Sequence, residues 1–320
     1  MKRPLSMVVG GLLACSALAS EPVTFCGRPL VAQPVAPNTW MVEGQREELS
    51  AQNCGHIGNQ AFIVTPNGVI VIDSGSSPAF GDAFKRLIGH YTDAPVRWVF
   101  NTHHHPDHFF GNAAFDQAEH LALSTTLLLM ARDRAALIDN VERLTGRALP
   151  RTRLSLPRSV APGAITLDGY PLTLFAMTGH SGGDLVLLDP ATKTLFLGDM
   201  AFYQRAPATA HTPGLDRWQA ELSQLRTLDA DIAVPGHGPS ATPSSVLDQT
   251  AAWLAWIDRR LSDTARAGLG ANAALDGAVP ERFNGVALDT LALGEYEFTR
   301  SVIQLYARYE EALLWGSDND

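Results

Sequence analysis

Hydrophobic and polar positions follow a strand-like pattern in several short runs of the chain. Residues 59–65 (NQAFIVT) and 68–73 (GVIVID) are rich in β-branched residues, and Pro66-Asn67-Gly68 between them is typical of a hairpin turn. Similar runs predict further strands. They cover residues 39–43, 96–102, 171–177, 184–188, 194–197 and 232–234.

Apolar residues recur at helical spacing between these runs. Phe80, Phe84, Leu87 and Ile88 predict a helix over residues 78–91. The same spacing predicts helices at residues 121–145, around Trp218, Leu222, Leu225 and Leu228, and at residues 244–262 and 293–314. Strands and then a helix, repeated once, predict two similar α/β halves packed sheet to sheet in one domain.

Composition and charge narrow the class of partner. The chain has 320 residues, of which 46% are hydrophobic and 18% charged, with a formal net charge of -9. No basic run follows the first few residues, which argues against nucleic acid or an anionic membrane as partner. A small-molecule substrate fits this composition better.

The N-terminus predicts export. Lys2 and Arg3 precede an apolar run at residues 5–14, and small residues follow at 17–19. The run is too short to cross a bilayer, so residues 1–19 are interpreted as a cleaved secretory signal and residues 20–320 as the mature domain. A lipid anchor at Cys15, within Leu12-Leu13-Ala14-Cys15, is the alternative.

Two further cysteines remain in the exported chain. Cys26 and Cys54 form an even pair in an oxidising compartment, which predicts a disulfide. It would close a loop of about 28 residues, a constraint on the order of 3 kcal/mol in the chain-entropy model. Two unrelated free thiols are the alternative.

A dense histidine cluster at residues 101–112 (NTHHHPDHFFGN) indicates metal chemistry. His103, His105, Asp107 and His108 fit the pattern H-x-H-x-D-H, and imidazole and carboxylate are common zinc ligands. One loop does not complete such a site, because zinc takes about four ligands.

Further ligand types stand where later strands end. In each case an apolar strand is followed by a turn of small residues, and the histidine or aspartate stands in that turn. Glycine in the turn lets the backbone come close to an ion. These residues are His180 in TGHSGGD, Asp199 in LGDM and His237 in VPGHG, with Asp73 at the end of GVIVID.

These five motifs, in this order, resemble the metallo-β-lactamase fold superfamily. The resemblance implies an α/β fold, a four-layer αββα sandwich with a core at residues 38–240 and a C-terminal helical extension at 241–315. It implies that one zinc is held by His103, His105 and His180, and a second by Asp107, His108 and His237. Asp199 would bridge the two Zn²⁺ ions, and Asp73 would be a carboxylate behind the ligands that positions their loop.

The chemistry that this resemblance implies is hydrolysis. A hydroxide shared by two zinc ions would be the nucleophile, and Asp107 would orient it as the catalytic residue. Familiar metallo-β-lactamases tend to carry cysteine or serine in place of Asp199, whereas a bridging aspartate is typical of glyoxalase II-like thioesterases and lactonases. Oxygen-reducing diiron relatives have glutamate at the position where this chain has His105, so the resemblance does not extend to them.

The stretch NTHHHPDHFFGNAAF, the arm MVEGQREELSAQNCGHIGNQAFIVT and the signal resemble the quinoprotein relay system zinc metallohydrolases. This likeness implies a periplasmic zinc hydrolase with a functional link to quinoprotein dehydrogenases. A β-lactam-hydrolysing class B enzyme is the first alternative, and a non-catalytic periplasmic partner protein is the second.

The remaining histidines have weaker patterns. His211 is interpreted as a substrate contact, with a plain surface loop as the alternative. His104 is expected to point away from the metals. His56 is expected at the surface, with a lid role as the alternative, and His120 is expected to face solvent.

Overall fold

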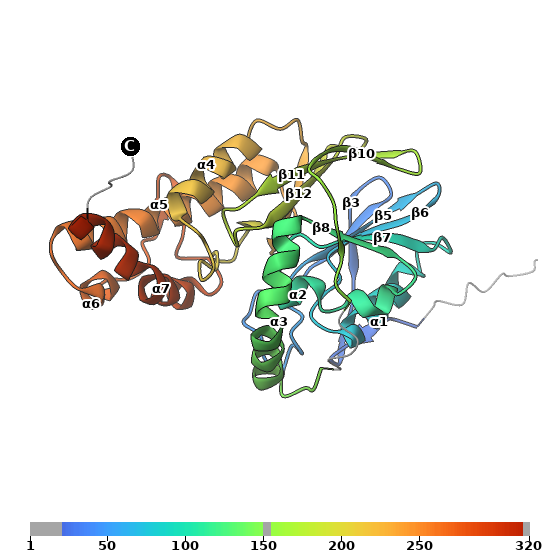
Figure 1. Ribbon diagram of the computed structural model, residues 1–320, viewed down its shortest axis with the longest axis horizontal. Helices are drawn as coiled ribbons and strands as arrows, with labels where there is room; N and C mark the ends of the chain where they lie inside the picture. Colours follow the sequence, from blue (N-terminus) through green and yellow to red (C-terminus); the bar gives the residue numbers. More distant parts are fainter. Residues whose placement is uncertain (1–20, 150–154, 316–320) are drawn as a thin grey trace, which may run out of the picture.

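Two β-sheets form the centre of the molecule (Figure 1). The computed structural model describes residues 21–149 and 155–315, so the predicted signal and Cys15 lie outside the described residues. The first sheet has the order β3-β4-β5-β6-β7-β8-β9 and the second β10-β11-β12-β13-β14. The first comprises β3 (Ala32–Ala36), β4 (Thr39–Val42), β5 (Gln60–Thr65), β6 (Gly68–Ile72), β7 (Val96–Phe100), β8 (Glu119–Ala122) and β9 (Arg158–Ser159). The second comprises β10 (Gly163–Leu167), β11 (Tyr170–Met177), β12 (Asp184–Asp189), β13 (Thr194–Phe202) and β14 (Ile232–His237).

The outer face of the first sheet is covered by α1 (Pro78–Ile88) and the short helix η1 (Asn112–Phe115). Ser77 caps α1 by accepting a hydrogen bond from the amide of Phe80, and Pro78 occupies its first turn. Phe80 and Phe84 are fully buried against the sheet, as their helical spacing predicts.

The inner faces of the two sheets pack on each other. Their shared core contains Ile70 and Phe100 from the first sheet and Leu174, Leu187 and Phe196 from the second. The outer face of the second sheet packs on α4 (Leu215–Leu225) and α5 (Pro243–Arg266). Helices therefore cover both outer faces, and the predicted αββα sandwich is confirmed.

A helical extension follows the second sheet. α6 (Ala271–Leu275) and α7 (Gly294–Trp315) lie beside α5, at the end of the molecule remote from the first sheet (Figure 1). Phe298 and Val302 of α7 share a core with Trp253 and Trp256 of α5. No helix in the described part of the chain is long and apolar enough to cross a membrane.

The sequence prediction was wrong at several boundaries. The helix predicted over residues 121–145 begins only at Ser124, as α3 (Ser124–Thr145), because Glu119–Ala122 pairs with β7 as strand β8. The helix predicted over residues 78–91 ends at Ile88, and the strand predicted over residues 194–197 runs to Phe202. Leu128 in α3 is 71% exposed. The prediction also missed β3, β9, β10 and α6, as well as two small hairpins. These hairpins pair β1 (Thr24–Phe25) with β2 (Arg28–Pro29) and β15 (Arg282–Phe283) with β16 (Val286–Ala287).

The predicted Cys26–Cys54 disulfide is present, with the two Cα atoms 6.0 Å apart. It ties the β1–β2 hairpin to the long segment between β4 and β5. This segment, residues 43–59, is called the β4–β5 loop below.

Candidate metal centre

The predicted site residues converge from both sheets. His103 and His105 lie in the loop after β7, and Asp107 and His108 follow on the short helix α2 (Pro106–Phe109). The second sheet supplies His180 after β11, Asp199 within β13 and His237 at the end of β14. The sequence therefore folds all seven of these residues into one place.

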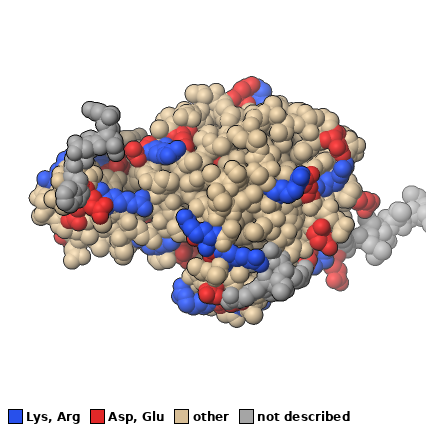
Figure 2. All heavy atoms as spheres, in the orientation of Figure 1, with Lys and Arg blue, Asp and Glu red and all other residues tan. Residues whose placement is uncertain are grey.

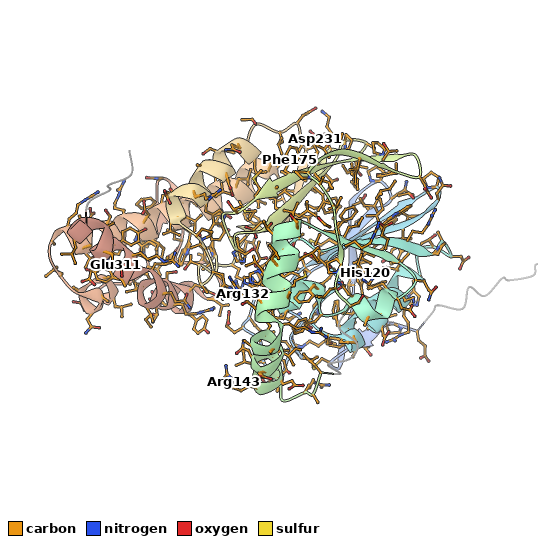
Figure 3. The ribbon with its side chains drawn as sticks, viewed as in Figure 1. His120, Arg132, Arg143, Phe175, Asp231 and Glu311 are labelled. Carbon is orange, nitrogen blue, oxygen red and sulfur yellow. A yellow bond between two sulfur atoms is a disulfide. The ribbon has the colours of Figure 1, made fainter. Side chains whose placement is uncertain are left out.

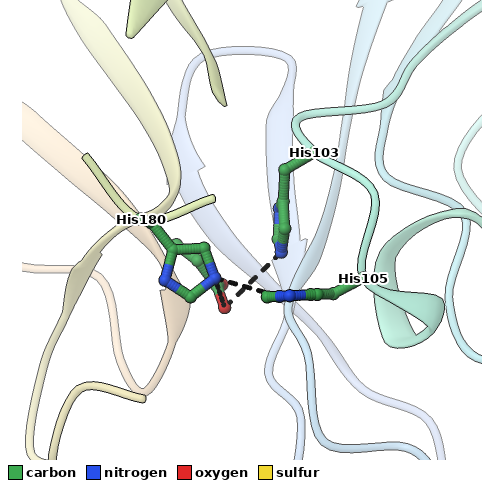
Figure 4. A group of neighbouring side chains, drawn as sticks. His103, His105 and His180 are labelled. Atoms are coloured by element: carbon green, nitrogen blue, oxygen red, sulfur yellow. Dashed lines mark hydrogen bonds and ion pairs between the residues drawn. The ribbon is translucent and has the colours of Figure 1, made fainter. Parts of the chain in front are cut away.

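The first group consists of His103, His105, His180 and Asp199. One ligand atom from each lies within 4.8 Å of the others. The His180 Nε2 atom is 2.9 Å from the His105 Nδ1 atom and 3.3 Å from the Asp199 Oδ2 atom. Figure 4 shows the three rings pointing toward a common position. This arrangement can hold one metal ion.

The second group consists of Asp107, His108 and His237, which also lie within 4.8 Å of one another. The Asp107 Oδ2 atom is 3.4 Å from the His108 Nε2 atom and 3.5 Å from the His237 Nε2 atom. All three side chains are buried. They offer two nitrogen donors and one carboxylate to a second ion.

Asp199 lies between the two groups. Its Oδ2 atom is 3.6 Å from the His103 Nε2 atom and 3.4 Å from the His237 Nε2 atom. Its Oδ1 atom is 3.2 Å from the His108 Nε2 atom. One carboxylate thus faces ligand atoms of both groups. Gly236 allows this approach, because a Cβ atom there would clash with the Asp199 carboxylate.

Several buried polar atoms at this place have no hydrogen-bond partner among the described residues. They are the His103 Nε2, His108 Nε2 and Asp199 Oδ1 atoms. An unsatisfied buried donor or acceptor costs about 1–3 kcal/mol, so a cluster of them needs an explanation. Imidazole nitrogens and carboxylates are the donor set that zinc takes, so the residues fit such an ion.

Asp73 supports the second group from behind. Its carboxylate accepts hydrogen bonds from the Thr102 amide and hydroxyl, both at 2.8 Å, and from the His108 Nδ1 atom at 2.7 Å. Asp73 has a φ of 59°, a left-handed conformation that is uncommon for residues other than glycine. The contact fixes the proton on Nδ1 and leaves Nε2 of His108 free for a ligand.

The β4–β5 loop supports His237. The His237 Nδ1 atom donates a hydrogen bond to the Ile57 carbonyl at 2.8 Å. Gly58 lies directly above the second group, and a Cβ atom there would come within 3.0 Å of the Asp107 Oδ2 and His108 Nε2 atoms. The loop that the disulfide anchors therefore shapes one wall of the centre.

Asp184 is a supporting residue that the sequence reasoning missed. Its Oδ2 atom accepts hydrogen bonds from the amides of His180 and Ser181, at 3.0 and 2.9 Å. These contacts hold the turn that presents His180, and burial raises the pKa of Asp184 to about 7. The serine and aspartate in HSGGD are a turn signal that could have indicated this role.

The pKa of His108 is shifted in the opposite direction to the pKa values of the three histidines of the first group. Burial lowers the pKa values of His103 and His105 well below the usual range, and that of His180 to about 3. Burial alone would also lower the pKa of His108, but the carboxylates of Asp107, Asp199 and Asp73 raise it well above its usual value. The three histidines of the first group are therefore neutral near pH 7, which is the metal-binding form of imidazole.

His211 lies beside the first group. Its Nδ1 atom is 2.5 Å from the His105 Nε2 atom, and it lines the same cavity as His105, His180, Asp199 and His237. His104 lies between His211 and Asp133, with its Nε2 atom 3.5 Å from the Asp133 carboxylate. His104 is in neither of the two ligand groups, although its ligand atom lies within 4.8 Å of those of His105 and His211.

Two histidine predictions were wrong. His56, expected at the surface, is buried against the rings of Phe25 and Phe80. His120, expected to face solvent, is buried, and its Nε2 atom contacts the Phe115 carbonyl at 3.0 Å. Both positions depend on neighbours that are distant in sequence or unrecognised as strands, so no local pattern indicates them.

The chain belongs to the metallo-beta-lactamase superfamily of hydrolases. The sequence profile described as "Metallo-beta-lactamase superfamily" matches residues 55–237, which include all the candidate ligands. Solved structures show the same fold. The metallo-beta-lactamase from Pontibacter korlensis aligns with a TM-score of 0.57 at 20% identity, over 71% of this chain and 99% of that one. The sec-alkylsulfatase Pisa1 from Pseudomonas sp. aligns with a TM-score of 0.66 at 17% identity, over 88% of this chain and 50% of that one.

Two curated relatives are longer than this chain and match only part of it. The 2,4-dinitroanisole O-demethylase subunit alpha of Nocardioides sp. (strain JS1661) is 28% identical over 53% of this chain and 49% of its own length. The linear primary-alkylsulfatase of Pseudomonas sp. (strain ATCC 19151) is 24% identical over 55% of this chain and 40% of its own. The chain thus spans about half the length of these relatives or less.

Proposed function

We propose that this protein is an exported hydrolase that uses two zinc ions, acting in the periplasm on a small molecule. The observation that carries the proposal is the Asp199 carboxylate, which lies between two groups of ligand side chains. The buried His103 Nε2 and His108 Nε2 atoms near it have no hydrogen-bond partner among the described residues. His103, His105 and His180 would hold one ion, and Asp107, His108 and His237 the other, with Asp199 shared.

Zinc in such a site lowers the pKa of water so that hydroxide is present near neutral pH, and it polarises the bond under attack. Asp107 would accept a hydrogen bond from the attacking water and orient it. Burial would raise the pKa of Asp107, but His108 and His237 hold it below its usual value, so the carboxylate is ionised for this role. The apolar wall formed by Leu49 and Ile57 limits the access of bulk water.

The names of the curated relatives suggest the bonds to test first. One is an O-demethylase and the other an alkylsulfatase, so ethers and sulfate esters join carboxylic esters in a substrate screen. We further propose that the chain is a quinoprotein relay system metallohydrolase, functionally linked to quinoprotein dehydrogenases. This part of the proposal is supported only by the sequence motifs and the N-terminal signal pattern.

Metal analysis tests the proposal directly. Protein purified without added metal is expected to contain about two zinc ions per chain, measured by elemental mass spectrometry. Asp199→Ala should lower this content and abolish hydrolysis of the substrates found in the screen, because the carboxylate faces both groups. Asp229→Ala is the matched control, since the Asp229 side chain is 81% exposed and pairs only with Lys193 among the described residues.

Other outcomes separate the alternatives. Folded protein without metal would contradict the hydrolase proposal and favour a non-catalytic partner, which co-purification with a dehydrogenase would reveal. Rapid hydrolysis of a cephalosporin or carbapenem would identify a β-lactamase.

A further inference from the structure

The cavity over the candidate metal centre carries positive charge away from the ligands. It has a volume of about 450 Å³, within the range for small-molecule sites. Arg143, Arg205 and Arg300 line it, and Glu48 is the single acidic residue on its described wall besides Asp107 and Asp199. In a protein with a formal net charge of -9, this wall is a local reversal of sign.

The arginines come from three separate elements. Arg143 lies near the C-terminal end of α3 (Figure 3), Arg205 follows β13, and Arg300 is on α7. In the face shown in Figure 2, most of the surface is neither basic nor acidic, and the basic and acidic side chains are scattered over it. Segments far apart in the sequence therefore bring three cationic side chains to one cavity.

The acidic residues nearby only partly neutralise these arginines. Arg205 is buried, contacts Glu48 at 2.9 Å and Glu297 at 3.5 Å, and its Nε atom has no partner among the described residues. Arg300 contacts the same two glutamates, at 3.8 Å for Glu48 and 3.4 Å for Glu297. Two glutamates thus serve two arginines, and neither of them contacts Arg143.

Arg143 is the least neutralised of the three. Its guanidinium donates a hydrogen bond to the neutral amide oxygen of Asn140 at 2.7 Å, and no acidic side chain of residues 21–149 or 155–315 is within ion-pair distance. Guanidinium groups pair with carboxylates and related oxyanions through two parallel hydrogen bonds. Leu137 and Leu144, on the same helix, add apolar surface to this wall.

We propose that Arg143 and Arg300 bind an anionic group of the substrate, a carboxylate or a similar oxyanion, while the reacting bond lies at the metal ligands. The substrate class is therefore a small molecule with an apolar body and an anionic end. This inference rests on the proposed function, because it takes the cavity over the candidate metal centre as the substrate site.

A binding experiment tests this without requiring hydrolysis. Glutarate has two carboxylates and butyrate has one, so their affinities for the zinc-loaded protein, measured by calorimetric titration, isolate the second anchor. We expect glutarate to bind about tenfold more tightly than butyrate, the effect of one charge-assisted pair. The double variant Arg143→Gln, Arg300→Gln should bring the ratio close to one.

Two control variants distinguish a direct contact with the ligand from the overall electrostatic effect of removing a positive charge. Arg147→Gln removes the same charge four residues after Arg143, just beyond the C-terminal end of α3 and outside this cavity, and should keep the wild-type ratio. Arg143→Gln alone changes an exposed side chain and avoids the risk that losing the Arg300 contacts unfolds α7. Its ratio is expected to fall between those of the wild type and the double variant.

Three results would contradict the proposed anionic subsite. Equal affinity for the two ligands, no binding of either, or the same loss in Arg147→Gln would overturn the proposal. None of these outcomes would change the zinc content or its dependence on Asp199, so failure of the anionic subsite is distinguishable from failure of the hydrolase proposal.

Discussion

At the residue scale, three of the candidate ligand histidines use their second ring nitrogen for contacts within the protein. His108 contacts Asp73 at 2.7 Å, and His237 contacts the Ile57 carbonyl at 2.8 Å. His105 meets His211 in the same way, through the nitrogen that faces away from His180. Such outer contacts fix which nitrogen is free for the metal, and they orient the ring.

His211 should therefore affect metal affinity even though it is outside the two ligand groups. We expect His211→Ala to weaken binding of one zinc ion about tenfold, the usual effect of losing an outer contact. His211→Asn should restore most of the affinity, because the Asn oxygen can stand near the position of the lost Nδ1 atom. Competition with a chromogenic chelator measures both values; equal affinity in wild type and His211→Ala would show that the contact does not support the site.

Residues close to a motif were predictable, whereas residues that depend on packing were not. His103 through His108, His180 and His237 stand at strand ends, and Asp199 lies within β13 beside the irregularity at Gly198. A local pattern gives their position, and the structure brings them together. His56 and His120 have no such pattern and are buried. The cavity arginines were missed because Arg143 and Arg300 meet the site only after α3 and α7 have docked.

At the element scale, the β4–β5 loop connects three features of the protein. It contains Cys54 of the disulfide, Ile57 behind His237 and Glu48 on the cavity wall. Asn53 stiffens the loop, since its side chain accepts hydrogen bonds from the amides of Ser50 and Gly55 and donates one to the Glu48 carbonyl.

Most of the strands and helices were predictable from the sequence, because their apolar residues recur with a clear period. The short strands β3, β9 and β10 were not, since two to five residues carry too little pattern.

Loss of the disulfide should lower stability measurably. Cys26 and Cys54 are 28 positions apart, and for a loop of that length the chain-entropy model gives about 3 kcal/mol. We expect the double variant Cys26→Ser, Cys54→Ser to lose a free energy of unfolding of this size in denaturant titrations of zinc-loaded protein. A loss below about 1 kcal/mol would mean that the internal contacts of the loop order it without the crosslink.

At the scale of the whole molecule, an ionic cluster joins the β4–β5 loop to the C-terminal extension. Arg205 and Glu297 are buried in it, and Glu48 and Arg300 complete it. Burial raises the pKa of Glu297 to about 7, against the lowering effect of Arg205 and Arg300. The C-terminal helix therefore docks through a titratable contact as well as through its apolar face.

This pKa predicts a pH dependence of stability. A carboxyl whose pKa is higher in the folded protein than its ordinary value of 4.5 stabilises the fold below pH 4.5, and that contribution is lost as pH rises through about 7. Between pH 5.5 and 7.5 the wild type should lose about 2 kcal/mol more than Glu297→Gln. Denaturant unfolding of both proteins, and of Glu310→Gln as an exposed control on the same helix, measures the difference. Parallel pH profiles for wild type and Glu297→Gln would contradict the prediction.

The division of the candidate ligands between the two sheets has a consequence for how the fold closes. Four of them, from His103 to His108, belong to the first half of the chain, and His180, Asp199 and His237 belong to the second. Neither half holds a complete set, so a bound metal ion would add its binding free energy to the docking of the two halves, beyond the apolar core that they share. Removal of the metal should then make it easier for the two sheets to separate.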